Sequence, residues 1–162
     1  MKAKLTQNIC YMAGLYGKGP KSQKNFVSIN SGISELRDRF VEIAVKDLGV
    51  LPNKIIFGSG TEKNTVGFFH SRVAKRLADL IKREVYVFKT DNELARGYLS
   101  GMFDAAGHIG QGSIEIRHIN SNDAIMLQNL GVHSRGDKIL NIKRFLGLVN
   151  DMSIIAASKA SF

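Results

Sequence analysis

Apolar residues recur at intervals of three and four along much of the chain, which is the spacing of amphipathic helices. This pattern predicts helices over residues 5–16, 34–49, 71–82, 91–107, 123–130 and 144–152. Shorter stretches rich in β-branched and aromatic residues predict strands at 26–29, 54–57, 65–69, 113–119 and 138–142. Residues 84–88 fit either another strand or an extended linker. The pattern therefore predicts an α+β protein.

Local signals place the ends of several of these elements. Thr6 and Ser34 stand where a helix N-cap is expected, and Gly49 stands where the second helix should end. The run Gly17-Lys18-Gly19-Pro20 should end the first helix. Residues 58–64 read as the turn of a hairpin that joins the strands at 54–57 and 65–69.

Three short words recur in the same order in the two parts of the chain. Tyr11–Tyr16 resembles Tyr98–Phe103, the Ile-Asn-Ser of residues 29–31 recurs at 119–121, and Leu-Gly-Val recurs at 48–50 and 130–132. The last two words lie 19 residues apart in the first part and 11 in the second, so the second intervening helix should be about two turns shorter. We therefore predict two units, residues 1–90 and 91–162, each helix–strands–helix–strands–helix.

Small residues lie among large apolar ones in both repeated helices. Ala13 and Gly14 occupy the first, and Ser100 and Gly101 occupy the second. Because such residues allow helix backbones to approach closely, we predict that the two helices pack together through these four positions. This contact would make a monomer with internal pseudo-twofold symmetry.

The charge is uneven as well as large. The formal net charge is +9; residues 1–90 hold 16 Lys/Arg against 7 Asp/Glu, whereas residues 91–162 hold 7 of each. A basic field of this kind attracts polyanions. The single cysteine, Cys10, argues against a disulfide framework, and no segment approaches the ~20 apolar residues of a membrane span. We expect a soluble, cytoplasmic protein with no membrane partner.

Leu99-Ser100-Gly101-Met102-Phe103-Asp104-Ala105-Ala106-Gly107 resembles the LAGLIDADG motif of homing endonucleases, and residues 12–16 resemble the start of a second copy. The resemblance implies two motif helices at a pseudo-twofold axis, with antiparallel sheets forming a saddle over nucleic acid. In that family the penultimate acidic residue of each motif binds the catalytic metal ions.

The metal-binding positions depart from the family pattern. Ala106 occupies this position in the second motif; in the first it falls at Gly19 if no gap is allowed, or elsewhere in residues 17–20, which contain no acid. Neither residue can supply the hard oxygen ligand that Mg²⁺ requires, so we predict no cofactor and no cleavage. Asp104 is an acid at an earlier position of the motif, where a structural role is expected. The alternative is an active DNA endonuclease that uses Mg²⁺ with shifted acids such as Asp104.

The strand regions are also short for this family. Residues 20–30 and 108–120 each allow one good strand and a stub, which shortens the saddle. The resemblance implies a nucleic-acid-binding protein, with structured RNA (ribosomal or intron RNA) slightly favoured over DNA, as in maturase- or ribosome-associated relatives. A scaffold that does not bind nucleic acid, with incidental charge, is a third interpretation.

The candidate nucleic-acid-binding residues are the basic ones near the first helix end, where we expect no acid to neutralise the lysine cluster, and those on predicted strands or their ends. They are Lys18, Lys21, Lys24, Lys54, Arg72, Arg117, Arg135 and Lys138. Helix residues Lys75, Arg76, Lys82 and Arg83 are expected behind the sheets. The four histidines lack the spacing of a metal site.

Overall fold

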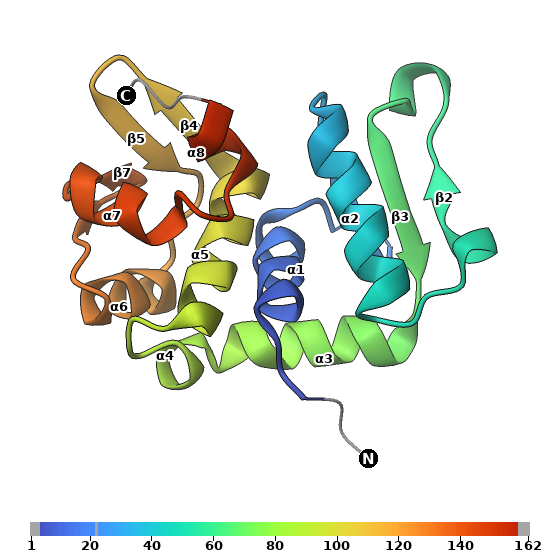
Figure 1. Cartoon of the computed structure of the whole chain (residues 1–162), viewed down its shortest axis with the longest axis horizontal. Helices are drawn as coiled ribbons and strands as arrows, with labels where there is room; N and C mark the ends of the chain where they lie inside the picture. The colour runs from blue at the N-terminus through green and yellow to red at the C-terminus, as the bar shows by residue number, and fades with distance from the viewer. Residues whose placement is uncertain (1–3, 22, 159–162) are drawn as a thin grey trace.

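Two helices stand side by side at the centre of the protein, with a small sheet on either side (Figure 1). They are α1 (Gln7–Lys18) and α5 (Glu93–Ala106). The computed structural model describes residues 4–21 and 23–158. Within these residues no helix is both long and apolar enough to cross a membrane.

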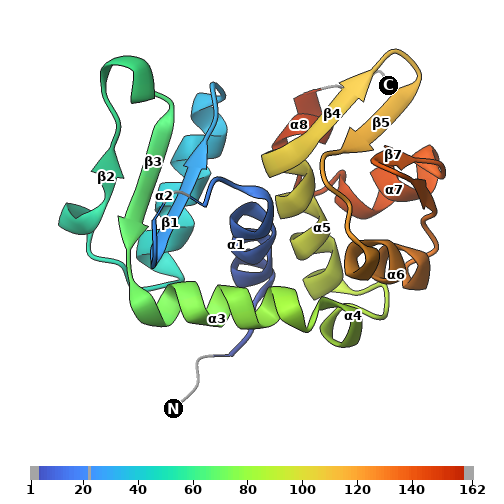
Figure 2. The same ribbon diagram turned by 180° about the vertical axis from the view of Figure 1, so that it is seen from behind.

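The first half places three antiparallel strands in the order β1-β3-β2. Its elements are β1 (Phe26–Asn30), α2 (Ser34–Lys46), the 3₁₀ turns η1 (Pro52–Lys54) and η2 (Gly60–Glu62), β2 (Ile56–Phe57), β3 (Thr65–Phe69) and α3 (Ser71–Lys82). Val27, Ile29, Val66 and Phe68 are buried on one face of this sheet, where Phe68 lies 5.7 Å from the ring of Phe40 on α2. The helix α3 then runs beneath α1 towards the second half (Figures 1 and 2).

The second half places four strands in the order β4-β5-β7-β6. Its elements are α4 (Glu84–Val87), α5, β4 (Gly107–Gly110), β5 (Ser113–Ile116), α6 (Ser121–Asn129), β6 (Ser134–Arg135), β7 (Lys138–Ile139), α7 (Ile142–Val149) and α8 (Ile154–Ser158). Ile114, Ile116 and Ile139 are buried in the core. The two sheets share their strand order except that, in the residues that the structure describes, the first has no strand equivalent to β4. The α+β, two-unit fold class is thus confirmed.

Backbone-to-backbone contact joins α1 to α5. A Cβ atom built on Gly101 would lie 2.0 Å from the carbonyl oxygen of Tyr11, and one built on Gly14 would lie 2.3 Å from that of Tyr98. Ala13 and Ser100 are also fully buried. Each glycine lacks the Cβ atom that would hold the two helices apart, so both motif helices depend on glycine at their crossing.

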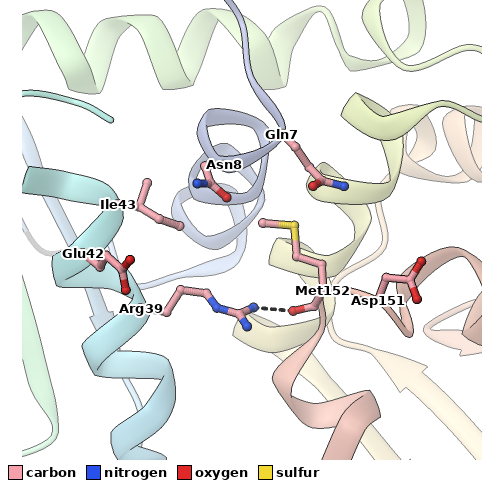
Figure 3. A pocket seen from close by; sticks show the side chains of 7 residues that line it. All are labelled: Gln7, Asn8, Arg39, Glu42, Ile43, Asp151 and Met152. Carbon is pink, nitrogen blue, oxygen red and sulfur yellow. Dashed lines mark hydrogen bonds between the residues drawn. The ribbon is translucent and has the colours of Figure 1, made fainter. Parts of the chain in front are cut away.

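A second link between the halves runs from α2 to the connection before α8. A pocket of about 250 Å³ lies at this junction, and Figure 3 shows Arg39 of α2 reaching across it to donate a hydrogen bond to the Met152 carbonyl oxygen. The Arg39 guanidinium also lies over the Tyr11 ring, 5.2 Å from its centre. One arginine thus contacts both halves.

Several sequence expectations need correction. Residues 84–87 form the helix α4, neither a strand nor an extended linker; Glu84 and Phe88 are buried while Tyr86 is 77% exposed. The helix α2 begins after Ile33, so Ser34 is its first residue and not its cap. Thr6 does cap α1 by accepting from the Ile9 N–H, and Gly49 follows α2 with a positive φ of 70°.

The comparison of the halves also changes in detail. The helix α6 has 9 residues against 13 in α2, a difference of about one turn and not two. Residues 107–116 form a hairpin of two equal four-residue strands, where one strand and a stub were expected. In the first half the expectation of one good strand is confirmed, since only β1 forms in the described residues between α1 and α2. The division at residue 90 stays a prediction, and it falls between α4 and α5.

Candidate nucleic-acid interface

The C-terminal ends of α1 and α5 meet at one pocket of about 460 Å³, which we call the central pocket. Figure 2 shows these two ends leading into the segment before β1 and into β4. The residues that line the pocket come from both motif helices and from the segments that follow β1 and β5. They include Lys18, Gly19, Asn30, Ser31, Asp104, Ala105, Arg117 and His118. The position corresponds to the floor of the predicted saddle.

The residues at the two motif ends do not fit divalent metal ions. At Gly19 a Cβ atom would lie 2.8 Å from the Leu15 carbonyl oxygen and 3.2 Å from that of Ser28, so the backbone leaves little room for any side chain. At Ala106 the backbone carbonyl accepts from the Arg117 N–H at 3.0 Å. Among the described residues no cluster of three His, Cys, Asp or Glu side chains could hold a metal. Neither Gly19 nor Ala106 therefore supplies a side-chain carboxylate of the kind that hard cations require.

Asp104 is close to the central pocket, but its carboxylate is fully engaged. It accepts from the hydroxyls of Tyr11 (2.5 Å) and Ser153 (2.6 Å), and from the backbone N–H groups of Ile154 (2.9 Å) and Ile155 (3.1 Å). The last two belong to the first turn of α8, where a negative charge compensates the free N–H groups. Asp104 is 5% exposed. Its geometry is that of a remote cap for α8.

Lys18 is the predicted contact whose surroundings differ most from expectation. Its Nζ lies 2.5 Å from Oδ2 of Asp123 and donates to the His118 carbonyl oxygen at 2.8 Å. The two side chains are only 10% and 2% exposed. The premise that no acid neutralises this lysine is therefore wrong, because Asp123 pairs with it. The sequence did not indicate this pair, since its members are 105 residues apart. Lys18 anchors the end of α1 to α6.

Glu84 lies in the same buried region and belongs to no predicted site. The Tyr98 hydroxyl donates to its Oε2 at 2.8 Å, and Glu84 itself is 1% exposed. Burial raises the pKa of Glu84, and a hydrogen bond with Asp123 and the charge of Asp123 raise it further. The hydrogen bond from Tyr98 and the positive charge of Lys18 act in the opposite direction and lower this pKa, so that its resulting value is about 8. The raised pKa favours the protonated form of Glu84 at neutral pH.

This raised pKa predicts that stability falls as the pH rises from about 4.5 to about 8. The folded state binds the proton more tightly than the unfolded chain, so the stabilisation is complete below the unfolded pKa of about 4.5 and is lost as pH rises through about 8. We expect the midpoint of thermal unfolding to fall by about 5 °C across this range. Glu84→Gln should flatten the profile, whereas Glu93→Gln, at an exposed position of α5, should leave it unchanged. Equal profiles for the wild type and Glu84→Gln would contradict the assignment.

The other two lysines near α1 differ from each other. The ammonium of Lys21 lies 3.5 Å from the centre of the Tyr16 ring and donates to the Tyr16 carbonyl oxygen. Partial burial lowers the pKa of Lys21 to about 8. Lys24 is exposed in the segment before β1. Of the three, Lys24 offers the most accessible positive charge.

One face of the second sheet carries a row of polar side chains across all four strands. The strand register pairs His108 with Glu115, Glu115 with Lys138, and Lys138 with Arg135. Cross-strand partners project from the same face of a sheet, so these four residues form a continuous line, which we call the polar row. Arg117 follows β5 on the same alternation and lines the central pocket. Of the candidates, the structure thus brings Arg117, Lys138 and Arg135 together.

The first sheet is different. Its register aligns Phe26 with Phe69, both Ser28 and Ile56 with Gly67, and Asn30 with Thr65, so the corresponding face is apolar at its Phe26–Phe69 end and polar at the other. Lys54 lies in η1, beside this sheet, and Arg72 lies in the first turn of α3. Arg72 shares a surface hollow with Lys75, Arg76 and Arg83, so it belongs with the α3 residues placed behind the sheets and not with the saddle.

No protein-family model matches the sequence. A stretch of 134 residues is 29% identical to an A-type ATP synthase subunit of Methanopyrus kandleri; it covers 79% of this chain but only 13% of that protein. Among solved structures, the homing endonuclease I-DmoI in complex with DNA and Mn has a TM-score of 0.68 at 16% identity, covering 88% of this chain and 96% of that chain. The N-terminal LAGLIDADG domain of DUF199/WhiA has a TM-score of 0.57 at 14% identity, covering 91% and 83%. The chain therefore has the LAGLIDADG fold, as its motif helices indicated.

Proposed function

We propose that this protein binds polynucleotides across the central pocket and the polar row, and that it does not cut them. The proposal that it does not cut them rests on the residues at the C-terminal ends of the two motif helices. Gly19 has no room for a side chain, Ala106 has no ligand atom, and Asp104 is held by four donors of its own chain. Neither motif end therefore offers a free carboxylate to bind the metal ions that assist phosphodiester hydrolysis.

The binding part rests on charge and on the fold. Arg117, Arg135 and Lys138 lie on one face with Glu115 among them and Asp137 in the adjoining turn, where Asp137 accepts from the Ile119 N–H. Basic side chains on a sheet face can contact successive phosphates. I-DmoI, whose fold this chain shares, is a homing endonuclease solved in complex with DNA. These features favour nucleic acid over a scaffold of incidental charge.

We favour structured RNA over DNA as the ligand. The strands of the second hairpin have four residues each, which at ~3.3 Å per residue gives a reach of about 13 Å. In the described part of the chain, the first sheet has no strand equivalent to β4. Such a shallow saddle can contact phosphates and the wide minor groove of an RNA helix, but it is poorly suited to reading a long DNA site in the major groove. Intron RNA and ribosomal RNA are the RNA classes that we propose to test first.

The first experiment separates binding from cleavage. Incubation with supercoiled plasmids or labelled oligonucleotides and Mg²⁺ or Mn²⁺ should give no nicked or linear product, while gel-shift titration of structured RNA and duplex DNA should show binding. Affinity should fall linearly in the logarithm of salt concentration. Specific cleavage would favour the alternative endonuclease with shifted acids, and no binding to any polynucleotide would favour the scaffold.

A charge-reversal pair tests the assigned face. Arg135→Glu with Lys138→Glu should weaken binding at least tenfold and reduce the log-salt slope by about 2. The matched control is Lys75→Glu with Lys82→Glu on the exposed surface of α3, which should change affinity much less. Equal losses in the two double variants would show that the binding face is elsewhere.

A further inference from the structure

Exposed apolar side chains that are not part of the hydrophobic core lie at the outer end of the first sheet. Phe69 is 48% exposed, Ile56 is 46% and Leu51 is 61%. They line a hollow of about 710 Å³, which we call the outer hollow, together with Lys54, Asn53 and His70. Ile56 aligns with Gly67 and Phe69 with Phe26, so these side chains share the face of the sheet that α2 does not cover. Figure 2 views the first half from this side, with β1 in front of α2.

The aromatic surface is built by the sheet itself. The rings of Phe26 and Phe69 lie 4.5 Å apart between centres. The Phe26 ring lies over Gly67, where a Cβ atom would come within 2.7 Å of its Cζ. Gly67 thus makes room for one ring flat against the strand, and that ring supports its more exposed neighbour. Phe69 has a free ring surface for another planar group.

The polar groups around the hollow are donors. The Nδ1 of His70 accepts from the Val73 N–H at 3.2 Å as the cap of α3, so a neutral His70 carries its proton on Nε2, where it can donate. Lys54 contributes a positive charge at the rim, and Asn53 an amide. Among the described residues that line the hollow, none is a carboxylate. An aromatic surface with donors and a cation matches a nucleobase and its phosphate.

We infer that the outer hollow binds an unpaired nucleotide of the polynucleotide that the rest of the saddle holds, with its base stacked on Phe69 and its phosphate near Lys54. The inference rests on the proposed function and specifies its ligand. The second sheet, with its polar row, takes the paired segment, and the first sheet takes a single-stranded extension or an unstacked base. The two halves of one fold therefore contact different parts of one ligand.

The test uses an RNA hairpin with a single-stranded extension that contains 2-aminopurine, and a fully paired hairpin without it. Stacking quenches 2-aminopurine, so its fluorescence should fall when the wild type binds. Phe69→Ala should abolish the quenching and weaken binding of the extended RNA about tenfold, the loss typical of one base–aromatic stack. Affinity for the paired hairpin should not change. A DNA version of both probes shows whether the hollow distinguishes the sugar.

Matched variants separate stacking from folding. Phe69→Tyr keeps the ring and should quench like the wild type, whereas Phe69→Leu keeps the apolar bulk and should not. Phe57→Ala removes a 68% exposed ring from the opposite face of the same sheet and should have no effect. Equal affinity of the wild type and Phe69→Ala for the extended RNA would overturn the inference while leaving the proposed function intact. Light scattering provides a further check. A wild type that is a dimer and a Phe69→Ala variant that is a monomer would also overturn the inference, because the patch would then be a self-association surface.

Discussion

Gly101→Ala should destabilise the protein by more than about 3 kcal/mol, because overpacking at a contact that cannot relax belongs to the upper end of single-residue effects. The new Cβ atom would lie 2.0 Å from the carbonyl oxygen of Tyr11 and 2.9 Å from its carbonyl carbon. Both are backbone atoms of α1, so relief requires the two central helices to move apart. Urea denaturation followed by circular dichroism would measure the loss.

A second glycine provides the control for helix propensity. Gly147 lies within α7, has no heavy atom within 4 Å of a built Cβ, and is not at a positive φ. Gly147→Ala should therefore be neutral or stabilise the protein by up to about 1 kcal/mol. Similar free energies of unfolding for the two alanine variants would show that the α1–α5 contact is looser than the structure places it.

Asp104→Ala should cost about 3 kcal/mol, since removing one member of a buried network leaves its partners unsatisfied. The four donors that lose their acceptor are the hydroxyls of Tyr11 and Ser153 and the N–H groups of Ile154 and Ile155. Asp104→Asn should cost less because one carbonyl oxygen remains. Thermal unfolding would measure both changes, and amide exchange at Ile154 and Ile155 would show whether α8 frays.

Asp151 offers the matched control for this carboxylate. It lies in the connection between α7 and α8, three residues before Ile154, and is exposed. Asp151→Ala should change stability by no more than about 0.5 kcal/mol. If Asp104→Asn left stability unchanged but removed a cleavage activity, Asp104 would be acting in catalysis and the proposed function would be wrong.

The fold followed from the sequence because its strongest signals are local. The apolar spacing marked every long helix, and the positions of Gly14 and Gly101 marked the crossing that the structure contains. The strand pattern failed at residues 84–88, where Val85, Tyr86 and Val87 favour a strand locally. Tertiary packing decided otherwise, because a helix lets both Glu84 and Phe88 turn inward, and Phe88 then stacks on Tyr98 at 4.4 Å.

The site was harder to predict than the fold. The resemblance to the LAGLIDADG motif identified Ala106 and Gly19 as positions without a metal ligand. The sequence could not show that Lys18 meets Asp123, since the partners lie in different halves. Nor could it show that Arg135 and Lys138 share one face with Arg117 while Arg72 lies among the basic residues of α3. Strand register and helix direction fix those placements, and both depend on long-range pairing.

The sequence by itself determined the longer helices, the glycines of the central crossing and the positive charge, because each is a property of residue type and spacing, and the motif resemblance located the missing acids. Only the tertiary structure decided which charges remain accessible and which face of each sheet is polar or aromatic. The physical reason is that burial and pairing join residues far apart in the chain, as Asp104 joins Tyr11 to α8.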